Sequence, residues 1–200
     1  MNYADIKKAD IANGTGVRVS VFVSGCTHHC KNCFNQEAWD FNYGKEFTQK
    51  EIDKVISELN HSYVEGLSLL GGEPLEYKNQ QGLLPLLRQV KQKFPDKNIW
   101  CYSGYTFEDD IMGKMYKNWE ETPELLSYID VLVDGKFEED KKDEESNKSE
   151  TSDSTTENDV KKNNFTGLSA IIPGQAEPGT LHEHTPQPQR SFRSFTPAPA

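Results

Sequence analysis

Three cysteines lie close together in a short stretch of this chain. Cys26, Cys30 and Cys33 have the spacing C-x3-C-x2-C, within eight residues and directly after an apolar run. Thiolates at such close spacing are suited to hold a metal centre. Disulfide bonds are the less favoured interpretation, because the spacing is tight and nothing in the sequence indicates a secreted chain.

Two kinds of metal centre are compatible with these cysteines. A zinc site needs a fourth ligand, for which His28, His29 and the distant Cys101 are the candidates. An iron–sulfur cluster is normally held by four cysteines, so three would leave one iron without a protein ligand. An open metal position is typical of catalytic sites, and an external molecule would then bind that iron. The cysteines alone leave both alternatives open.

A second motif favours the iron–sulfur interpretation. The run Gly71-Gly72-Glu73-Pro74 follows the cysteines by about 40 residues. Glycines allow backbone groups to approach a ligand closely, because no Cβ stands in the way. Alone, the run would indicate only a tight turn between a strand and a helix. Near a cysteine cluster it indicates a ligand site.

These motifs must be positioned by regular elements. Alternating or β-branched apolar residues predict strands at 17–23, 66–70, 98–102 and 128–133. Three helices are predicted between them. The first begins with the capping-box pattern of Thr48 and Glu51, followed by Ile52, Val55, Ile56 and Leu59. The second carries Leu83, Leu86, Leu87, Val90 and Phe94, and the third covers 106–117 with Phe107, Ile111 and Met115 on one face.

Alternating strands and helices predict an α/β fold with a parallel sheet and right-handed crossovers. Four strands are too few for a closed barrel, so we expect an open, partial (β/α) barrel. In such sheets ligands bind beyond the carboxyl ends of the strands. The cysteines, Gly71-Gly72, Ser103-Gly104 and Asp134-Gly135 all follow strands and are expected to share one rim.

Composition excludes several classes of protein. The chain has 32 acidic and 22 basic residues, a formal charge of −10, which does not suit a protein that coats nucleic acid. No apolar run approaches the ~18 residues that cross a bilayer. The first 13 residues lack the apolar region of a signal peptide. We therefore expect a cytoplasmic protein with neither nucleic acid nor membrane as partner.

The chain divides near Phe137. Residues 1–137 are the predicted folded domain, and residues 138–200 are a predicted tail. Between 138 and 164 the only apolar residue is Val160, and six prolines follow from Pro173 onward. Such a composition cannot bury enough surface to offset the entropy of ordering, so the tail is predicted to be disordered. The alternative is that 165–172 returns as a strand that covers a sheet edge.

The domain resembles the radical S-adenosylmethionine superfamily, which uses C-x3-C-x2-C for a [4Fe-4S] cluster. Within it, the sequence is similar to the small enzymes that activate glycyl radical enzymes, of the kind that serves anaerobic ribonucleoside-triphosphate reductase. The matching stretches are 18–26, 33–35 with Trp39, 71–75, 102–105 and 129–137. The resemblance implies a partial barrel of the radical S-adenosylmethionine type. After Asp143 the chain departs from the family's usual continuation.

The resemblance also implies roles for individual residues. Cys26, Cys30 and Cys33 would each ligate one iron, and the fourth iron would take the amino and carboxylate groups of S-adenosylmethionine. Residues along the adenosyl part would be Asn32, Cys33 and Phe34. Residues at the methionyl amino group, acting largely through backbone, would be Gly71, Gly72 and Glu73. Independently of the resemblance, we expect His28 and His29 to be exposed loop or cluster-tuning residues rather than ligands, and Cys101 to be a buried strand cysteine near the rim rather than a ligand.

The implied activity is that of a radical oxidoreductase. An electron from a reduced flavodoxin-like donor would cleave S-adenosylmethionine, and the resulting 5′-deoxyadenosyl radical would take a hydrogen atom from a glycine. The implied partner is the large subunit of anaerobic ribonucleoside-triphosphate reductase. Alternatives are an activating enzyme for a formate-lyase type of glycyl radical enzyme and, from another class, a zinc-binding module without catalysis.

Overall fold

The computed structural model describes residues 1–136 and 169–171. The strands are β1 (Asn2–Asp10), β2 (Val17–Val23), β3 (Lys45–Glu46), β4 (Val64–Gly71), β5 (Asn98–Tyr102), β6 (Val131–Asp134) and β7 (Ser169–Ile171). The helices are η1 (Gln36–Trp39), α1 (Gln49–Leu59), α2 (Tyr77–Lys93), η2 (Phe107–Met115), α3 (Tyr116–Asn118) and α4 (Glu121–Tyr128). None of the helices in these ranges combines the length and apolar character needed to span a bilayer.

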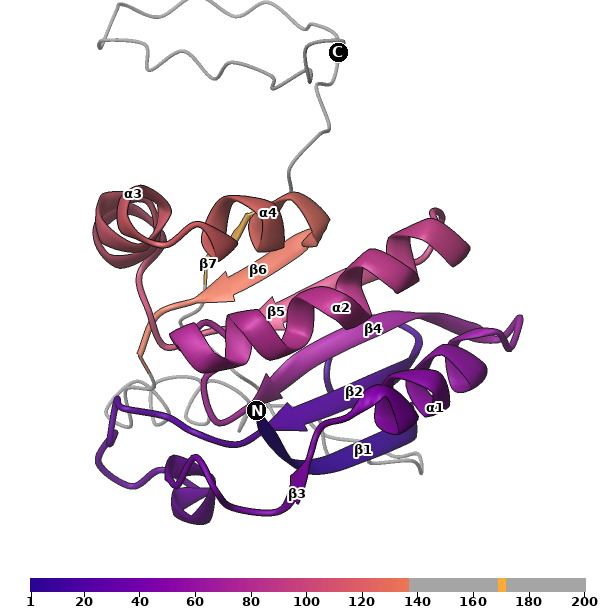
Figure 1. Cartoon of the computed structure of the whole chain (residues 1–200), viewed down its shortest axis with the longest axis horizontal. Helices are drawn as coiled ribbons and strands as arrows, with labels where there is room; N and C mark the ends of the chain where they lie inside the picture. The colour runs from indigo at the N-terminus through magenta and orange to yellow at the C-terminus, as the bar shows by residue number, and fades with distance from the viewer. Residues whose placement is uncertain (137–168, 172–200) are drawn as a thin grey trace, which may run out of the picture.

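The strands form one open sheet in the order β3-β1-β2-β4-β5-β6-β7 (Figure 1). The four strands predicted from the sequence, β2, β4, β5 and β6, are parallel neighbours at its centre. The α/β prediction is therefore confirmed. The prediction of a wholly parallel sheet is wrong, because β1, β3 and β7 pair antiparallel at the two edges. The sheet does not close into a barrel.

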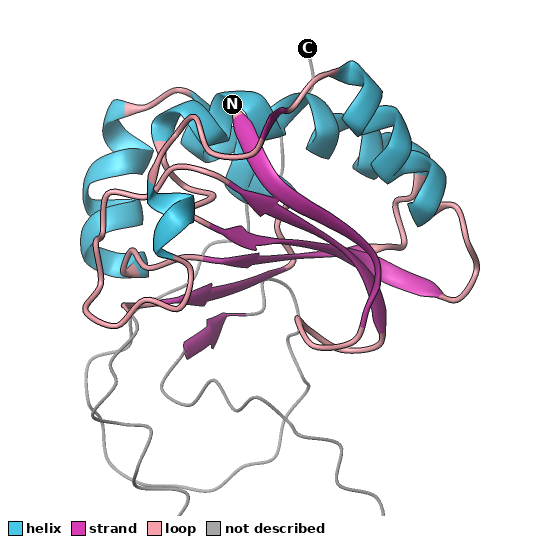
Figure 2. Ribbon diagram, turned by 90° about the horizontal axis from the view of Figure 1, so that it is seen from below, coloured by secondary structure: helices cyan, strands magenta, loops and turns pink. Residues whose placement is uncertain are grey.

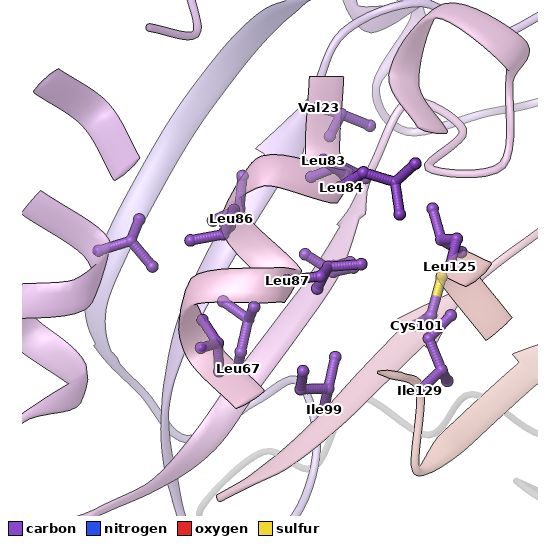
Figure 3. Close-up of a cluster of buried hydrophobic side chains, with 14 of the residues drawn as sticks. Val23, Leu67, Leu83, Leu84, Leu86, Leu87, Ile99, Cys101, Leu125 and Ile129 are labelled. Atoms are coloured by element: carbon purple, nitrogen blue, oxygen red, sulfur yellow. The ribbon is translucent and has the colours of Figure 1, made fainter. Parts of the chain in front are cut away.

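The helices lie on one side of this sheet, which curves beneath them (Figure 2). Alternate strand residues point to the helices, and the core forms where they meet the apolar stripes of α1 and α2 (Figure 3). The predicted stripe of α1 is buried, and Thr48 and Glu51 form the predicted capping box. On α2, Leu83, Leu86, Leu87 and Val90 are fully buried.

The region after β5 differs from its prediction. The third predicted helix is a π-helix, η2, that continues into α3 and ends at Asn118. Its apolar residues recur every four positions, a wider spacing than the 3.6 residues of an α-helix turn. A further helix, α4, begins at Glu121 and includes Tyr128, so the last parallel strand starts only at Val131. Leu125 of α4 is fully buried in the core.

Most of the predicted tail, including the boundary near Phe137, lies outside the described residues. The exception is β7, whose Ser169, Ala170 and Ile171 pair with Asp134, Val133 and Leu132. At these three residues the structure departs from the predicted disorder and corresponds to the alternative of a returning strand. The physical reason is that β6 would otherwise present unpaired backbone groups at the sheet edge.

Candidate functional site

The three clustered cysteines lie on one loop after β2, and backbone bonds hold the start of this loop. Gly25 N donates to Ala38 O at 2.8 Å, and Cys26 N donates to Trp39 O at 3.2 Å. Ala38 and Trp39 belong to η1, the short helix that follows the cysteines. The first residues of the loop are therefore held in place by the helix at which the loop ends.

Within the loop the chain turns twice through the left-handed region. His29 has φ 46° and Asn32 has φ 60°, and each precedes a cysteine. Asparagine and histidine adopt this region more readily than most residues. Cys33 N donates to Cys30 O at 3.1 Å, which closes the second turn. These turns keep Cys26, Cys30 and Cys33 on one compact loop.

The four cysteines differ in accessibility. Cys26, Cys30 and Cys33 are half-buried free thiols, whereas Cys101 on β5 is completely buried. Burial raises the pKa of the Cys26 thiol to about 11 and the pKa of Cys101 well above its usual value. Cys101 belongs to the hydrophobic core and not to the loop. Its predicted role as a buried strand cysteine is therefore confirmed.

The Gly71-Gly72 turn after β4 lies directly against the base of the cysteine loop. Gly72 N donates to Val23 O at 2.7 Å, and Glu73 N donates to Gly25 O at 2.9 Å. A Cβ on Gly72 would stand 2.6 Å from Gly25 O, closer than such atoms approach, and Gly71 has φ 110°. Glycine is required at both positions for this close approach. The two sequence motifs are thus adjacent in space.

The Glu73 side chain, like its backbone, forms hydrogen bonds at the site. The side chain is 1% exposed and accepts hydrogen bonds from Leu75 N at 2.9 Å and Ser103 Oγ at 2.9 Å. Gly104 N donates to its other oxygen at 2.7 Å, and His28 Nε2 lies 2.9 Å from that same oxygen. The carboxylate therefore joins the ends of β2, β4 and β5.

Two positioning residues, Glu76 and Asn79, were missed by the sequence analysis. Glu76 accepts hydrogen bonds from Thr27 N at 2.9 Å and from Tyr105 OH at 3.1 Å. Asn79 of α2 donates to Glu73 O at 2.8 Å and to Ser24 O at 3.1 Å. Their sequence separation from the loop, about 50 residues, hides these contacts from any local pattern. The one available signal is their position just after the Gly-Gly turn.

The predicted common rim is confirmed by contacts between the strand ends. Ser103 and Gly104 bond to Glu73, as described above, and Gly135 N donates to Tyr105 O at 3.1 Å. Asp134 accepts a hydrogen bond from Phe107 N at 2.7 Å and so caps the start of η2. These contacts give Asp134 a structural role at the end of β6.

The loop residues beyond Cys30 are more open. Asn32 is exposed, and Phe34 is 79% exposed beside Cys33. The two histidines separate: His28 has a side chain only 7% exposed, while His29 is exposed with its ring 4.6 Å from that of Trp39. Of the two roles expected for His28, that of an exposed residue is wrong, because Glu73 and Tyr105 enclose its imidazole, and that of a cluster-tuning residue stays a prediction.

Within 1–136 and 169–171, no three His, Cys, Asp or Glu side chains are grouped to hold a single metal ion. The three candidates for a fourth zinc ligand are each engaged elsewhere: His28 on Glu73, His29 on Trp39 and Cys101 in the core. These positions weigh against zinc. A cluster distributes its thiolates over separate irons, so three free thiols on one loop fit it better.

Comparison with known proteins bears on the same loop. A family model described as a 4Fe-4S single cluster domain matches residues 12–156. The anaerobic ribonucleoside-triphosphate reductase-activating protein of Pasteurella multocida is 41% identical over 145 residues, covering 72% of this chain and 88% of the relative. The proteins so named from Enterobacteria phage T4 and Vibrio cholerae are 41% and 42% identical over 138 and 147 residues. These stretches cover 69% and 72% of this chain, and 82% and 88% of the relatives.

The domain is thus of the single-cluster 4Fe-4S class, in agreement with three free thiols on one loop. More closely, the chain belongs to the family of anaerobic ribonucleoside-triphosphate reductase-activating proteins.

Proposed function

We propose that this protein activates an anaerobic ribonucleoside-triphosphate reductase by generating a glycyl radical on its large subunit. The observation that carries the proposal is the contact between the cysteine loop and the Gly71-Gly72 turn, with Glu73 N bonded to Gly25 O. This contact brings a three-thiol loop directly against the glycine turn. The names of the relatives supply the partner.

We assign three irons of a [4Fe-4S] cluster to Cys26, Cys30 and Cys33, which leaves one iron for S-adenosylmethionine. When bound, the cluster supplies the electron that cleaves the sulfonium and yields a 5′-deoxyadenosyl radical, which removes a hydrogen atom from the reductase glycine. A reduced flavodoxin-like protein is the proposed electron source. The remaining task of this chain is to bind and orient the reactants and to exclude water.

Separate parts of the rim suit separate parts of S-adenosylmethionine. Gly71 and Gly72 are assigned to the methionyl amino group, which can donate to backbone carbonyls that these residues do not cover with a Cβ of their own. Phe34 exposes an aromatic ring directly after Cys33, and with Asn32 it is assigned to the adenosyl group. The carboxylates of Glu73 and Glu76 hold the first half of the loop, at His28 and Thr27, to the glycine turn.

The proposal is tested by anaerobic reconstitution and radical detection. The reduced protein and S-adenosylmethionine are mixed with the large subunit of an anaerobic ribonucleoside-triphosphate reductase, and a glycyl radical is sought by electron spin resonance. We expect the signal and stoichiometric methionine release. A signal with a formate-lyase type of subunit instead would show that the partner is wrong. One tightly held zinc without acid-labile sulfide would refute the enzyme assignment.

The ligand assignment has its own test. Cys26→Ala, Cys30→Ala and Cys33→Ala are each expected to lose the cluster, because three thiolates are the minimum that the proposal uses. Cys101→Ala is the matched control, since Cys101 lies in the core and off the loop. Iron and sulfide content measured after anaerobic purification distinguishes them. Cluster loss in the Cys101 variant alone would contradict the assignment.

A further inference from the structure

A hydrogen-bonded network of residues from three strand ends surrounds the first half of the cysteine loop. It consists of two loop residues, two carboxylates of the turn after β4 and three residues that follow β5. We call it the carboxylate network; its members are Thr27, His28, Glu73, Glu76, Ser103, Gly104 and Tyr105. None of these side chains is a proposed iron ligand, so the network calls for a separate explanation.

His28 is the loop residue most deeply enclosed by this network. Its Nε2 lies 2.9 Å from Glu73 Oε2, and its ring centroid lies 4.3 Å from that of Tyr105. A Cβ on Gly104 would stand 2.8 Å from the His28 ring. In the turn after β5, Gly104 therefore leaves space for the imidazole, and Tyr105 packs against it.

The other hydrogen bonds of Glu73 indicate which partner donates in its contact with His28. Leu75 N, Gly104 N and Ser103 Oγ all donate to the Glu73 carboxylate. A carboxylate surrounded by donors accepts from His28 as well, which assigns the proton to His28 Nε2. A glutamine at position 28 carries an amide nitrogen that can replace this donor, whereas an alanine cannot.

The neighbouring residue Thr27 is held in the same way by the second carboxylate. Its backbone N donates to Glu76 Oε1 at 2.9 Å and its hydroxyl donates to the same atom at 2.5 Å. Burial raises the pKa of Tyr105 to about 12, so its phenol stays protonated and donates to Glu76 at 3.1 Å. Two successive loop residues between Cys26 and Cys30 are thus held by one turn.

We propose that His28 is a positioning residue: through Glu73 it fixes the cysteine loop against the Gly71-Gly72 turn. This inference rests on the proposed function, because it concerns how the thiolates and the turn are held for one ligand, S-adenosylmethionine. Glu73 connects the glycine turn to the cysteine loop, because its backbone follows Gly72 directly and its side chain contacts His28. His28 acts on S-adenosylmethionine only through this arrangement and does not touch it.

The consequence is a change in ligand affinity with little change in iron content. Without His28 the three thiols remain, so the cluster still assembles. The loop of the variant, however, is less ordered before S-adenosylmethionine binds. Part of the binding free energy is then used to order the loop, so the ligand binds more weakly. We expect the dissociation constant for S-adenosylmethionine to rise about tenfold in His28→Ala, equivalent to about 1.4 kcal/mol.

The test compares the His28→Ala and His28→Gln variants of the full chain with the wild-type protein. His29→Asn is the matched control, because it removes the adjacent exposed imidazole and keeps a residue that tolerates the left-handed backbone of position 29. Val55→Ala, a core variant on α1, controls for a general loss of stability. Three quantities are measured: iron content, the S-adenosylmethionine dissociation constant, and hydrogen exchange of residues 25–33 in cluster-free protein.

The proposal requires weaker S-adenosylmethionine binding and faster exchange at 25–33 in His28→Ala, and near wild-type values in the other three variants. Equal affinities in His28→Ala and His29→Asn would overturn it. Iron loss in both His28 variants would also overturn it, because His28 would then be a ligand. Failure of the wild-type protein to take up a cluster would instead refute the proposed function.

Discussion

Replacement of Arg18 is expected to destabilise the domain strongly, although Arg18 forms no ion pair within residues 1–136 and 169–171. Arg18 is fully buried near the start of β2. Its Nε donates to Ser68 Oγ at 2.6 Å, and its Nη2 donates to Leu67 O at 2.8 Å and Asn98 O at 3.2 Å. Nη1 donates to Thr15 O at 3.2 Å.

The magnitude follows from what Arg18→Met leaves behind. Four acceptors lose a donor: Ser68 and Leu67 are buried, Asn98 is half-buried and Thr15 is exposed. A buried acceptor without a partner costs about 1–3 kcal/mol. Two opposing effects reduce the total. Methionine fills most of the vacated volume, and it removes a buried charge, whose unfavourable burial lowers the pKa of Arg18 to about 10. We expect a net loss of about 2–4 kcal/mol in the free energy of unfolding.

The assay is denaturant unfolding of the cluster-free protein under reducing conditions. Arg88→Met is the matched control: Arg88 forms two hydrogen bonds to Glu124 at 2.6 and 2.7 Å, but its side chain is 54% exposed. Exposed ion pairs contribute little, so this variant should remain close to wild type. If Arg18→Met lost no more stability than Arg88→Met, the reasoning from buried carbonyl acceptors would be refuted.

Three further predictions concern the rim, a π-helix carboxylate and the core cysteine. Gly72→Ala should reduce the free energy of unfolding by about 1–3 kcal/mol, measured by thermal unfolding, because its Cβ would lie 2.6 Å from Gly25 O. Hydrogen bonds from Lys114 and the Thr106 backbone lower the pKa of Asp110 to about 2, so Asp110→Asn should be less stable than wild type at pH 7. In urea unfolding, this difference should shrink as the pH falls toward 2 and wild-type Asp110 becomes protonated. Cys101 should resist alkylation at pH 8 in folded cluster-free protein and react in denaturant, as peptide mass analysis would detect.

The central fold could be predicted because its elements are regular. The strand at 17–23 agrees with β2, and 98–102 agrees with β5, because both segments are rich in β-branched and aromatic residues. The capping box of α1 is a local signal that needs no tertiary information. The order of strands and helices then sets the parallel arrangement through the handedness of crossovers.

The missed elements have irregular patterns. In β1 the buried residues are Tyr3, Ile6 and Asp10, because register shifts interrupt the pairing with β2. A strict alternation of period two is therefore absent from the sequence. Helix α4 is only eight residues long, with Pro123 in its first turn, and it is stabilised mainly by burial of Leu125. Tertiary contacts determine both elements.

The candidate site shows a similar division. Cys26, Cys30, Cys33 and the glycine pair could be identified from type and spacing, because ligands and close backbone approaches demand particular residues. The side chains that position them could not. Glu73 was expected to act largely through its backbone, and nothing in the sequence near His28 indicates a carboxylate 45 residues away.

The turn after β4 therefore has two functions that the sequence pattern shows only in part. Its glycines allow the turn to approach the backbone of Gly25 closely, while Glu73 and Glu76 hold the cysteine loop through His28 and Thr27. Because residues 71–76 include both the glycines and the carboxylates that contact the cysteine loop, we expect a displacement of the loop to displace the turn as well. Under the proposed function, this geometry would couple cluster position to ligand affinity, and the carboxylates would do so without touching the iron or the ligand.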